Sequence, residues 1–570
     1  MPSRHNDAMT IMPALSRWLP LASSALLAAC ASLPSAPSAA ALHVDVPAVA
    51  HPGGETPAWW YRDGAAQAAG RGAMAGRAKN IIVFLGDGMS LTTVAAARIL
   101  EGQRNGSSGE EHLLAWETFP ATAFSKTYNT DSQTPDSAGT MSAITTGVKT
   151  HMGAIAVYAG SENDCADSLG KHAQTWLELA DAAGMATGVV STARITHATP
   201  AATYAHVPNR GWENNAALPA AAVAAGCKDI ALQLIEAGRA GHGPGIVLGG
   251  GRKEFLTRDQ SDPQQPGQRG LRSDGRDLIA EWQRDHPQGA YVTDAAGLAA
   301  AAGAPSVLGL FNYDHMQYDH DRIATGSGEP SLAAMTRAAI AHLARNPNGY
   351  VLMVEGAKID MAHHDGNAYR ALDETIAFSD AVRAAMEATS SEDTLILVTA
   401  DHSHTLNFVG YPTRGNPILG KVRGRSSFDG EPGALAKGLD GLPYTTLGYA
   451  NGPGNTGASD AQPTGSKRYP HGPKKLLAPA TGRPDLTAVD TSAPDYMQEA
   501  LVPLAAESHG GEDVGIWARG PGSGAVRGTL EQNAIYHILV QAAPRLRAAL
   551  CGKGLCDGNG VPVELPGGNP

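Results

Sequence analysis

The sequence lacks several features that mark common classes of protein. Its 570 residues carry a formal net charge of −12 and no basic stripe, which argues against nucleic-acid binding as the main role. Beyond the N-terminal region, no apolar run approaches the roughly 20 residues that a membrane-spanning helix needs. No internal repeat is visible. The chain is longer than one ordinary domain core supports, so we expect one large domain that carries insertions.

The N-terminus has the pattern of an export signal. Arg4 and Arg17 precede the mostly apolar run Leu19–Ala29, which ends directly before Cys30. These features are typical of a secretory signal over residues 1–29. Because Cys30 directly follows this signal, the segment resembles a bacterial lipoprotein signal, in which the cysteine after the cleavage site is lipidated. An ordinary signal peptide and a short anchor helix are the alternatives. We therefore expect an exported, membrane-anchored protein that faces the periplasm or the cell surface.

Cysteine is scarce, with five residues in the chain. If Cys30 carries the lipid, an even number remains for disulfide bonds in an oxidising compartment. Cys551 and Cys556 are close enough in sequence to close a small loop, which would leave Cys165 to pair with Cys227. Four cysteines permit three pairings, and we expect this one.

Composition changes along the chain suggest domain boundaries. Alanine, proline, serine and glycine dominate residues 30–76, which predicts a flexible tether. Residues 77–556 would form the large domain, and residues 557–570 a polar tail. Within the domain, residues from about 407 to 501 are rich in glycine and proline and predict an insertion.

Continuous apolar runs predict a buried parallel sheet. The runs have strand length, lack polar alternation and are separated by helical patterns, one of them over residues 367–387: they are Ile81–Leu85, Ile246–Leu248, Tyr350–Val354 and Thr394–Thr399. Such strands occur in sheets that are covered by helices on both faces. The predicted class is α/β, with a central, mostly parallel sheet.

Acidic residues follow three of these runs. Asp87, Glu355 and Asp401 each come at the end of a predicted strand. Ligands of open parallel sheets bind beyond the carboxyl ends of the strands. Buried carboxylates are costly without a countercharge, so their convergence on one edge predicts divalent metal ions.

Ligand types separate the predicted metal sites. Asp360 and His364 are four residues apart, on one face of a helical turn, and with His509 they offer a mixed set suited to zinc. Asp401 and His402 could serve a second zinc together with Asp87. Glu355 is expected to face a magnesium site with oxygen ligands. His363 is expected to be a supporting or surface histidine.

Ser137 is the candidate nucleophile. It follows Thr134-Pro135-Asp136 at an abrupt helix start, where its oxygen would lie among free backbone N–H groups. A plain capping serine is the alternative, and it is the commoner role at such positions. A metal ion nearby would favour the nucleophile, because zinc can stabilise a serine alkoxide.

Taken together, the motifs resemble those of the alkaline phosphatases, in order and spacing. They are Gly86–Met89, Asp136–Thr140, Val354–Gly356, Ile359-Asp360, Thr399–His404 and His509–Asp513, and the resemblance runs from Lys79 to about Gln541. It implies an alkaline-phosphatase-like sheet with a crown-like insertion at about residues 407–501. A crown often takes part in dimer contacts, so a homodimer is one implied state.

The resemblance also implies a role for each site residue. It assigns one zinc to Asp360, His364 and His509, a second zinc to Asp87, Asp401 and His402, and a magnesium to Asp87, Thr199 and Glu355. Arg210 would bind two phosphate oxygens, which favours a doubly charged monoester. Ser137 would become phosphorylated in the first of two in-line displacements, and water would then release inorganic phosphate.

Two positions depart from the common pattern. His197 falls near the third metal, where relatives carry aspartate or histidine, and its softer imidazole could let zinc or cobalt compete with magnesium. Met361 stands where relatives often have a lysine or histidine that helps to hold phosphate. A methionine cannot supply that charge, so we expect weaker product retention.

Rival functions share the scaffold. A sulfatase would need a Cys/Ser-x-Pro-x-Arg motif, whereas Ser137 lies in DSAGT. A phosphodiesterase fits Arg210 less well, because that side chain matches a dianionic group. A lipid-anchored metal- or phosphate-binding protein without turnover would lack a nucleophile or ligand, and none is missing. The leading expectation is a phosphomonoester hydrolase.

Overall fold

The structure is a computed structural model that describes residues 41–50, 53–161, 163–424 and 433–567. Residues 41–570 group into one compact unit. The predicted signal over residues 1–29 and the predicted lipidation site, Cys30, lie outside the described residues. Within the described part, no helix combines the length and the apolar character that crossing a bilayer requires.

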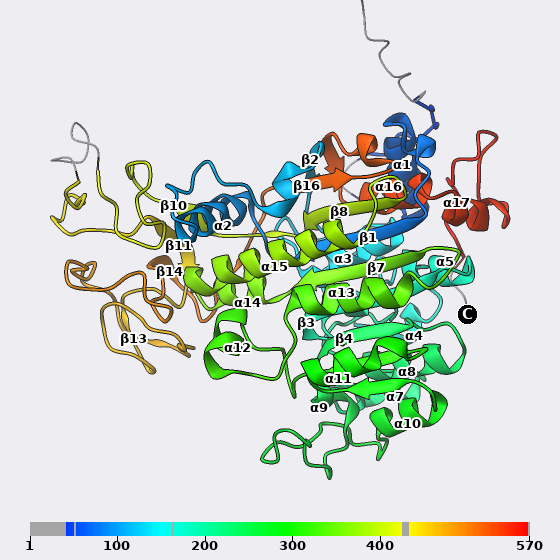
Figure 1. Ribbon diagram of the computed structural model, residues 1–570, viewed down its shortest axis with the longest axis horizontal. Coiled ribbons are helices and arrows are strands. Elements are labelled where there is room, and N and C mark those ends of the chain that lie inside the picture. The colour runs from blue at the N-terminus through cyan, green and yellow to red at the C-terminus, as the bar shows by residue number, and fades with distance from the viewer. Residues whose placement is uncertain (1–40, 51–52, 162, 425–432, 568–570) are drawn as a thin grey trace, which may run out of the picture. The chain divides into compact units, whose positions relative to one another are not determined.

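A ten-stranded sheet forms the centre of the described chain, in the order β17-β2-β16-β8-β1-β7-β3-β4-β6-β5 (Figure 1). Neighbouring strands are parallel, except that β16 is antiparallel to β2 and β8. The strands are β1 (Asn80–Gly86), β2 (Ala121–Lys126), β3 (Ala186–Arg194), β4 (Ile246–Gly250), β5 (Ala290–Val292), β6 (Val307–Leu310), β7 (Tyr350–Gly356), β8 (Thr394–Ala400), β16 (Val514–Arg519) and β17 (Gly528–Glu531). The predicted α/β class with a mostly parallel sheet is confirmed, and the four predicted strands are β1, β4, β7 and β8.

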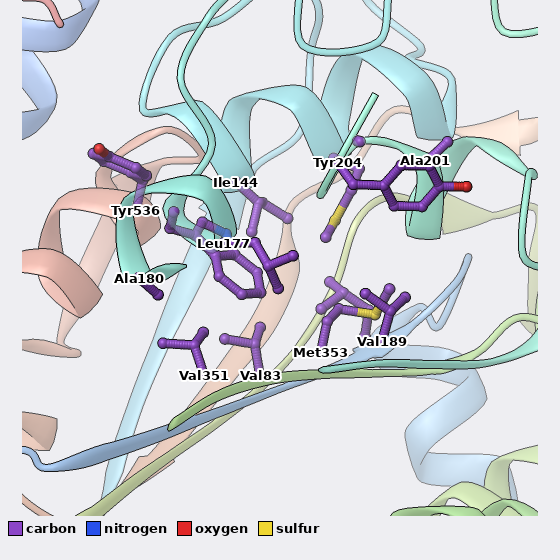
Figure 2. Packing of buried hydrophobic residues seen from close by; sticks show 14 of the residues in the cluster. Val83, Ile144, Leu177, Ala180, Val189, Ala201, Tyr204, Val351, Met353 and Tyr536 are labelled. Carbon is purple, nitrogen blue, oxygen red and sulfur yellow. The ribbon is translucent and has the colours of Figure 1, made fainter. Parts of the chain in front are cut away.

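Both faces of the sheet are buried, which explains why its strands show no polar alternation. In β1, Val83 packs on one face, whereas Ile82 and Phe84 pack on the other. Figure 2 shows the first face, where Val83 and Met353 lie beneath residues of the covering helices. A strand with apolar neighbours on both sides gains from apolar residues at every position.

Helices cover each face. The first face is covered by α1 (Pro57–Gly70), α3 (Ser137–Thr146), α5 (Trp176–Ala182), α8 (Ile230–Arg239), α10 (Leu278–Asp285), α16 (Ala534–Ala542) and α17 (Pro544–Cys551). The second is covered by α2 (Leu91–Arg104), α11 (Ala295–Ala300), α13 (Leu332–Leu343), α14 (Lys358–His364) and α15 (Ala368–Ala388). The short helices are α4 (Cys165–Ser168), α6 (Ala198–Ala201), α7 (Ala220–Ala224), α9 (Arg252–Phe255) and α12 (Asp319–Thr325). The helix predicted over residues 367–387 is α15.

The ends of the compact unit differ from the prediction. Residues 57–70, expected within a flexible tether, form α1, which buries Trp60 and Tyr61 and packs against α16. Gly64 faces His537 so closely that a Cβ atom would meet its ring at 2.5 Å. The tether prediction is therefore wrong for this segment. Its small residues let two helices approach closely, whereas composition alone suggested a flexible chain.

The polar tail is also partly folded. Val561 and Val563, within the predicted tail 557–570, are buried beside Val44 and Ala65. A few apolar residues are enough to fold the C-terminal segment back onto α1. The compact unit therefore extends on both sides of the predicted 77–556 range.

The two expected disulfides are present in the structure. Cys165 is bonded to Cys227 across 62 residues, and Cys551 to Cys556 across five. The first ties the segment around α4 to the segment before α8, and the second closes a small loop after α17.

The described residues of the predicted insertion have little regular structure. Its strands β10 (Leu406–Phe408), β11 (Leu447–Gly452) and β14 (Ala500–Pro503) form a small sheet, and β12 (Ala458–Ser459) pairs with β13 (Leu476–Ala478). Lysine ammonium groups bind backbone carbonyls between these strands. Lys421 Nζ donates to three of them at 2.8–3.3 Å, and the buried Lys467 Nζ donates to Gly457 and Pro463 at 2.7 and 2.6 Å. These bonds replace part of the hydrogen bonding that longer strands would provide.

Candidate metal centre and nucleophile

The order of the strands brings three carboxylates to one edge of the sheet. β1 lies between β7 and β8, and Leu85 pairs in register with both Glu355 and Thr399. Asp87 and Asp401 follow their strands directly, so the three acids of this edge, Asp87, Glu355 and Asp401, are neighbours and fully buried. Their mutual repulsion must be offset by protons or by cations.

One group of ligand atoms gathers around Asp360. His364 Nε2 and His509 Nε2 lie 3.3 and 3.4 Å from Asp360 Oδ1, and the two imidazole nitrogens are 3.2 Å apart. The four-residue spacing in α14 places Asp360 and His364 on one face of the helix, as predicted. His509 comes from β15 (His509–Gly510), which pairs with β9 (Ser403–His404).

A second group surrounds His402. Its Nε2 lies 3.3 Å from Asp87 Oδ1 and 3.4 Å from Asp401 Oδ2. Ser137 Oγ lies 3.0 Å from the same nitrogen and 3.4 Å from Asp87 Oδ1. The serine hydroxyl therefore faces this group directly.

The imidazoles present their lone pairs to the centre of the site. The Nδ1 atoms of His364, His402 and His509 bond to the backbone carbonyls of Glu507, Ser403 and Pro135. Carbonyl oxygens only accept hydrogen bonds, so each Nδ1 carries the ring proton. Each Nε2 is left free to bind a metal ion, and the donor set fits zinc.

A third group contains polar atoms without hydrogen-bond partners. Asp87, Glu355 and His197 have potential ligand atoms within 4.8 Å of one another. Among the residues that the structure describes, Asp87 Oδ2, Glu355 Oε1 and the nearby Thr199 Oγ1 are buried and have no hydrogen-bond partner. Orphaned atoms of this kind carry a large free-energy cost unless a ligand satisfies them, and a cation would do so.

The pKa values of the buried acids are shifted in different directions. Burial, reinforced by Asp401 and Asp360, raises the pKa of Asp87 well above its usual value. Burial raises the pKa of Glu355 to about 8. Burial acts on Asp360 as well, but His364 and His404 outweigh it and hold the pKa of Asp360 well below its usual value.

His404 is a site residue to which no role was assigned from the sequence. It is fully buried, and it bonds to Asp360 Oδ1 through Nε2 at 2.7 Å and to Glu507 through Nδ1. Burial lowers its pKa, but Glu507 and Asp360 outweigh that effect and raise it to about 10. Both ring nitrogens of His404 thus face carboxylate oxygens, so the ring links Asp360 to Glu507. The spacing of Asp401-His402-Ser403-His404 was the only signal for it in the sequence.

The supporting histidine is buried. His363 bonds to Thr93 Oγ1 at 3.0 Å and to the Tyr449 hydroxyl at 2.8 Å, and it stacks on His404 with 4.8 Å between ring centroids. Of the two alternatives for His363, supporting or surface, the structure therefore favours the first. Met361, on the same helix, is partly buried and packs against the cluster of Tyr318, Ala362 and Ala371.

Ser137 is the first residue of α3, and Asp136 caps the helix. The Asp136 side chain accepts hydrogen bonds from the backbone N–H groups of Gly139 and Gly153 at 3.1 and 3.0 Å. It also accepts from Arg210 Nη1 at 3.0 Å, while Arg210 Nη2 donates to His197 Nε2 at 3.1 Å. Arg210 is held beside the serine with part of its side chain, 28 %, exposed.

Acid and imidazole groups around a buried serine, at the carboxyl edge of a parallel sheet, define the class as a metal-dependent hydrolase. The sequence model of the family described as alkaline phosphatase matches residues 78–544. The chain is 42 % identical over 477 residues to the tissue-nonspecific alkaline phosphatase of Gallus gallus, covering 82 % of this chain and 84 % of that one. It is 40 % identical to an alkaline phosphatase of Gadus morhua, covering 82 % and 92 %.

Solved structures give the same fold. The alkaline phosphatase of Thermus thermophilus superimposes with a TM-score of 0.56 at 23 % identity, over 82 % of this chain and 92 % of that one. The enzyme from the Antarctic bacterium TAB5 superimposes with a TM-score of 0.52 at 21 % identity, over 82 % and 98 %. The chain belongs to the alkaline phosphatase family, and it is a metal-dependent hydrolase with several sets of metal-binding residues.

Removal of metal should lower the melting temperature, and the loss should grow as pH rises. In metal-free protein the pKa of Glu355 is about 8, above the value of 4.5 for an ordinary glutamate. A folded-state pKa above the unfolded one contributes stability that is complete below about pH 4.5 and is lost as pH rises through 8. A bound cation replaces the proton, so metal-loaded protein should not show this loss.

The measurement is the melting temperature of metal-loaded and chelator-treated protein between pH 5 and 9. The difference between the two should widen over this range, and Glu355→Gln should flatten the pH dependence of the chelator-treated form. A difference that stays constant or narrows would contradict the interpretation.

Proposed function

We propose that the protein hydrolyses phosphate monoesters through a phosphoserine at Ser137, with two zinc ions and one magnesium ion. The observation that carries the proposal is the position of Ser137 Oγ, 3.0 Å from His402 Nε2 and 3.4 Å from Asp87 Oδ1. The alternative role of Ser137 as a capping residue is not needed, because Asp136 caps this helix.

The donor sets support a division of the metals. The zinc sites would be Asp360, His364 and His509 for one ion, and Asp87, Asp401 and His402 for the other, because mixed nitrogen and oxygen donors suit zinc. The oxygen atoms of Asp87, Thr199 and Glu355 suit magnesium. When bound, the zinc ions would favour the ionised forms of the serine hydroxyl and of water, and would offset negative charge on the leaving oxygen.

The protein groups would position the substrate for two successive substitutions at phosphorus. Arg210, oriented by Asp136, would bind two non-bridging phosphate oxygens through its planar guanidinium. Ser137 Oγ would attack phosphorus as the bond to the alcohol breaks, and the alcohol leaves with a proton. Water would then attack the phosphoserine, which regenerates the Ser137 hydroxyl and releases inorganic phosphate. The N-terminus of α3 favours the negative charge at this position.

Substitution of the nucleophile should abolish most of the activity without unfolding the protein. For Ser137→Ala, we expect kcat for p-nitrophenyl phosphate to fall by about 10³-fold or more, and EDTA-treated wild-type protein should lose activity as well. Ser168→Ala is the control, because Ser168 is a buried serine in α4, outside these motifs, and it donates to Cys165 O. Bis(p-nitrophenyl) phosphate measures the diesterase alternative. Equal activity in native, EDTA-treated and Ser137→Ala protein would disprove the proposal.

His197 supports a third site that takes zinc or cobalt in competition with magnesium. Its imidazole lies with Asp87 and Glu355. Because Nε2 accepts from Arg210, the proton of the neutral ring is on Nδ1, so a metal ion would bind either ring nitrogen only in place of the Arg210 hydrogen bond. Burial also lowers the pKa of His197 well below its usual value, which keeps the ring neutral. A neutral imidazole prefers zinc or cobalt over magnesium.

Replacement of His197 should therefore change the metal content. Metal-free protein equilibrated with zinc and excess magnesium should retain more than about two zinc ions per chain in the wild type. His197→Asp should retain fewer zinc ions and more magnesium, as measured by mass spectrometry of the eluted metals. Identical metal content in the two proteins would refute this assignment.

The export signal supports lipid anchoring at Cys30. The apolar run Leu19–Ala29 and the cysteine after it are the basis of this proposal, and acylation there would attach the enzyme to a membrane facing the periplasm or the cell surface. In a bacterial host, the wild type should fractionate with membranes and incorporate labelled palmitate, whereas Cys30→Ser should not be labelled. Labelling of both proteins, or of neither, would rule out this anchor.

Exposed apolar residues on the crown support a homodimer. Phe408 on β10 and Leu501 and Val502 on β14 are 42 %, 80 % and 48 % exposed, beside a hollow of about 720 Å³ that Leu501 helps to line. Apolar side chains exposed on the two outer strands of one small sheet favour an interface there. The residues at the crown are the same in each copy, so a second copy of this chain is the proposed partner.

A charge placed at Leu501 should separate the subunits. Leu501→Arg should shift the mass measured by light scattering from that of a dimer to that of a monomer. Leu477→Arg, at a residue 62 % exposed on β13, is the matched control and should leave the dimer intact. A wild-type protein that elutes as a monomer would contradict the proposal.

A further inference from the structure

Glu507 contacts the candidate zinc ligands in a way that the proposed function does not use. The side chain is 1 % exposed and lies two residues before His509. Its backbone N–H donates to His364 O at 2.9 Å, and its backbone oxygen accepts from His364 Nδ1. Glu507 therefore binds one candidate ligand at two points with its main chain alone.

The backbone contact fixes how His364 presents its ring. Because Glu507 O can only accept, the proton of the His364 ring is on Nδ1. Its Nε2 lone pair is then directed at the space shared with Asp360 Oδ1, 3.3 Å away, and His509 Nε2, 3.2 Å away. A hydrogen bond of this kind sets both the tautomer and the orientation of a metal-binding imidazole.

The side chain reaches the other candidate ligand through His404. Glu507 Oε2 accepts from His404 Nδ1, and His404 Nε2 in turn donates to Asp360 Oδ1 at 2.7 Å. Glu507 Oε1 accepts from the backbone N–H and the hydroxyl of Thr405, at 2.6 and 2.5 Å. Both carboxylate oxygens are thus occupied, and the carboxylate is fixed in one orientation.

The strand pairing connects the third ligand to the same residues. His509 in β15 pairs in register with His404 in β9, so the residue that bridges Glu507 to Asp360 also lies beside His509. We propose that Glu507 is a positioning residue that holds Asp360, His364 and His509 together before the metal binds, and so sets how tightly this site retains its ion. The inference rests on the ligand assignment in the proposed function.

Removal of the carboxylate charge tests this role. Glu507→Gln keeps the backbone contacts with His364 but replaces one acceptor oxygen by an NH₂ group. Because the NH₂ group cannot accept, the side chain loses its hydrogen bonding either from His404 or from Thr405. We expect one metal equivalent to bind about 10- to 100-fold more weakly, the range found for supporting residues of metal sites. The readout is the transfer of zinc from the holoenzyme to a colorimetric chelator, with zinc per chain measured before and after.

Two variants separate positioning from general destabilisation. Glu507→Asp retains the charge and should lie between the wild type and Glu507→Gln. Glu329→Gln is the matched control, because Glu329 is a buried glutamate that accepts from Gln317 N, away from these ligands, and it should retain zinc like the wild type. Excess zinc should restore kcat in Glu507→Gln, since no ligand has been removed.

Three outcomes would overturn the inference. Glu507→Gln could release zinc no faster than Glu329→Gln, its kcat could fail to recover at saturating zinc, or its metal-free form could melt well below that of Glu329→Gln. His364→Ala distinguishes this failure from failure of the proposed function. If His364→Ala loses the same metal equivalent while Glu507→Gln does not, only the role of Glu507 is wrong. If His364→Ala retains all its metal, the ligand assignment and the role of Glu507 are both wrong.

Discussion

Three carboxylates, Asp87, Glu355 and Asp401, are buried side by side at one edge of the sheet, and the rest of the site is arranged around the charge that this creates. No lysine or arginine forms an ion pair with them among the described residues. A cluster of this kind is stable only when protons or cations neutralise it. The raised pKa values of Asp87 and Glu355 show that these acids hold protons more readily when no metal is bound. The neighbouring imidazoles supply the further ligands that a bound metal ion would need.

The topology of the sheet makes this crowding unavoidable. β1 lies between β7 and β8 in parallel register, so whatever follows these three strands meets at one edge. Helices bury both faces of the sheet, which leaves the strand ends as the place where polar groups can meet a substrate. The same edge receives the N-terminus of α3, which places Ser137 among the carboxylates and imidazoles.

Around the candidate ligands lies a layer of groups that fix geometry. Backbone carbonyls set the tautomers of His364, His402 and His509. His404 connects Asp360 to Glu507, and a Cβ atom at Gly88 would meet the His404 ring at 2.3 Å, so the turn after Asp87 must carry no side chain. In a family whose chemistry depends on metal ions, this layer determines whether the ligands are ready before an ion arrives.

The sequence by itself determined the strands and the acids that follow them, because these features are local. An apolar run ending in an acid remains one whatever packs around it, so the convergence of Asp87, Glu355 and Asp401 on one edge of a parallel sheet could be predicted before the strand order was known. Asp360 and His364 were paired by helical spacing. Thr199 and Arg210 carry no local pattern of this kind, and they were placed only through the resemblance to the family.

Only the tertiary structure decided which groups meet across long stretches of chain. His404 contacts Glu507 across 103 residues, and neither residue has a local pattern that reveals the other. The same applies to α1, whose alanines and glycines have the composition of a tether although the helix packs against α16. Composition and spacing describe what a segment can do, whereas its partners depend on packing between segments that are distant in sequence.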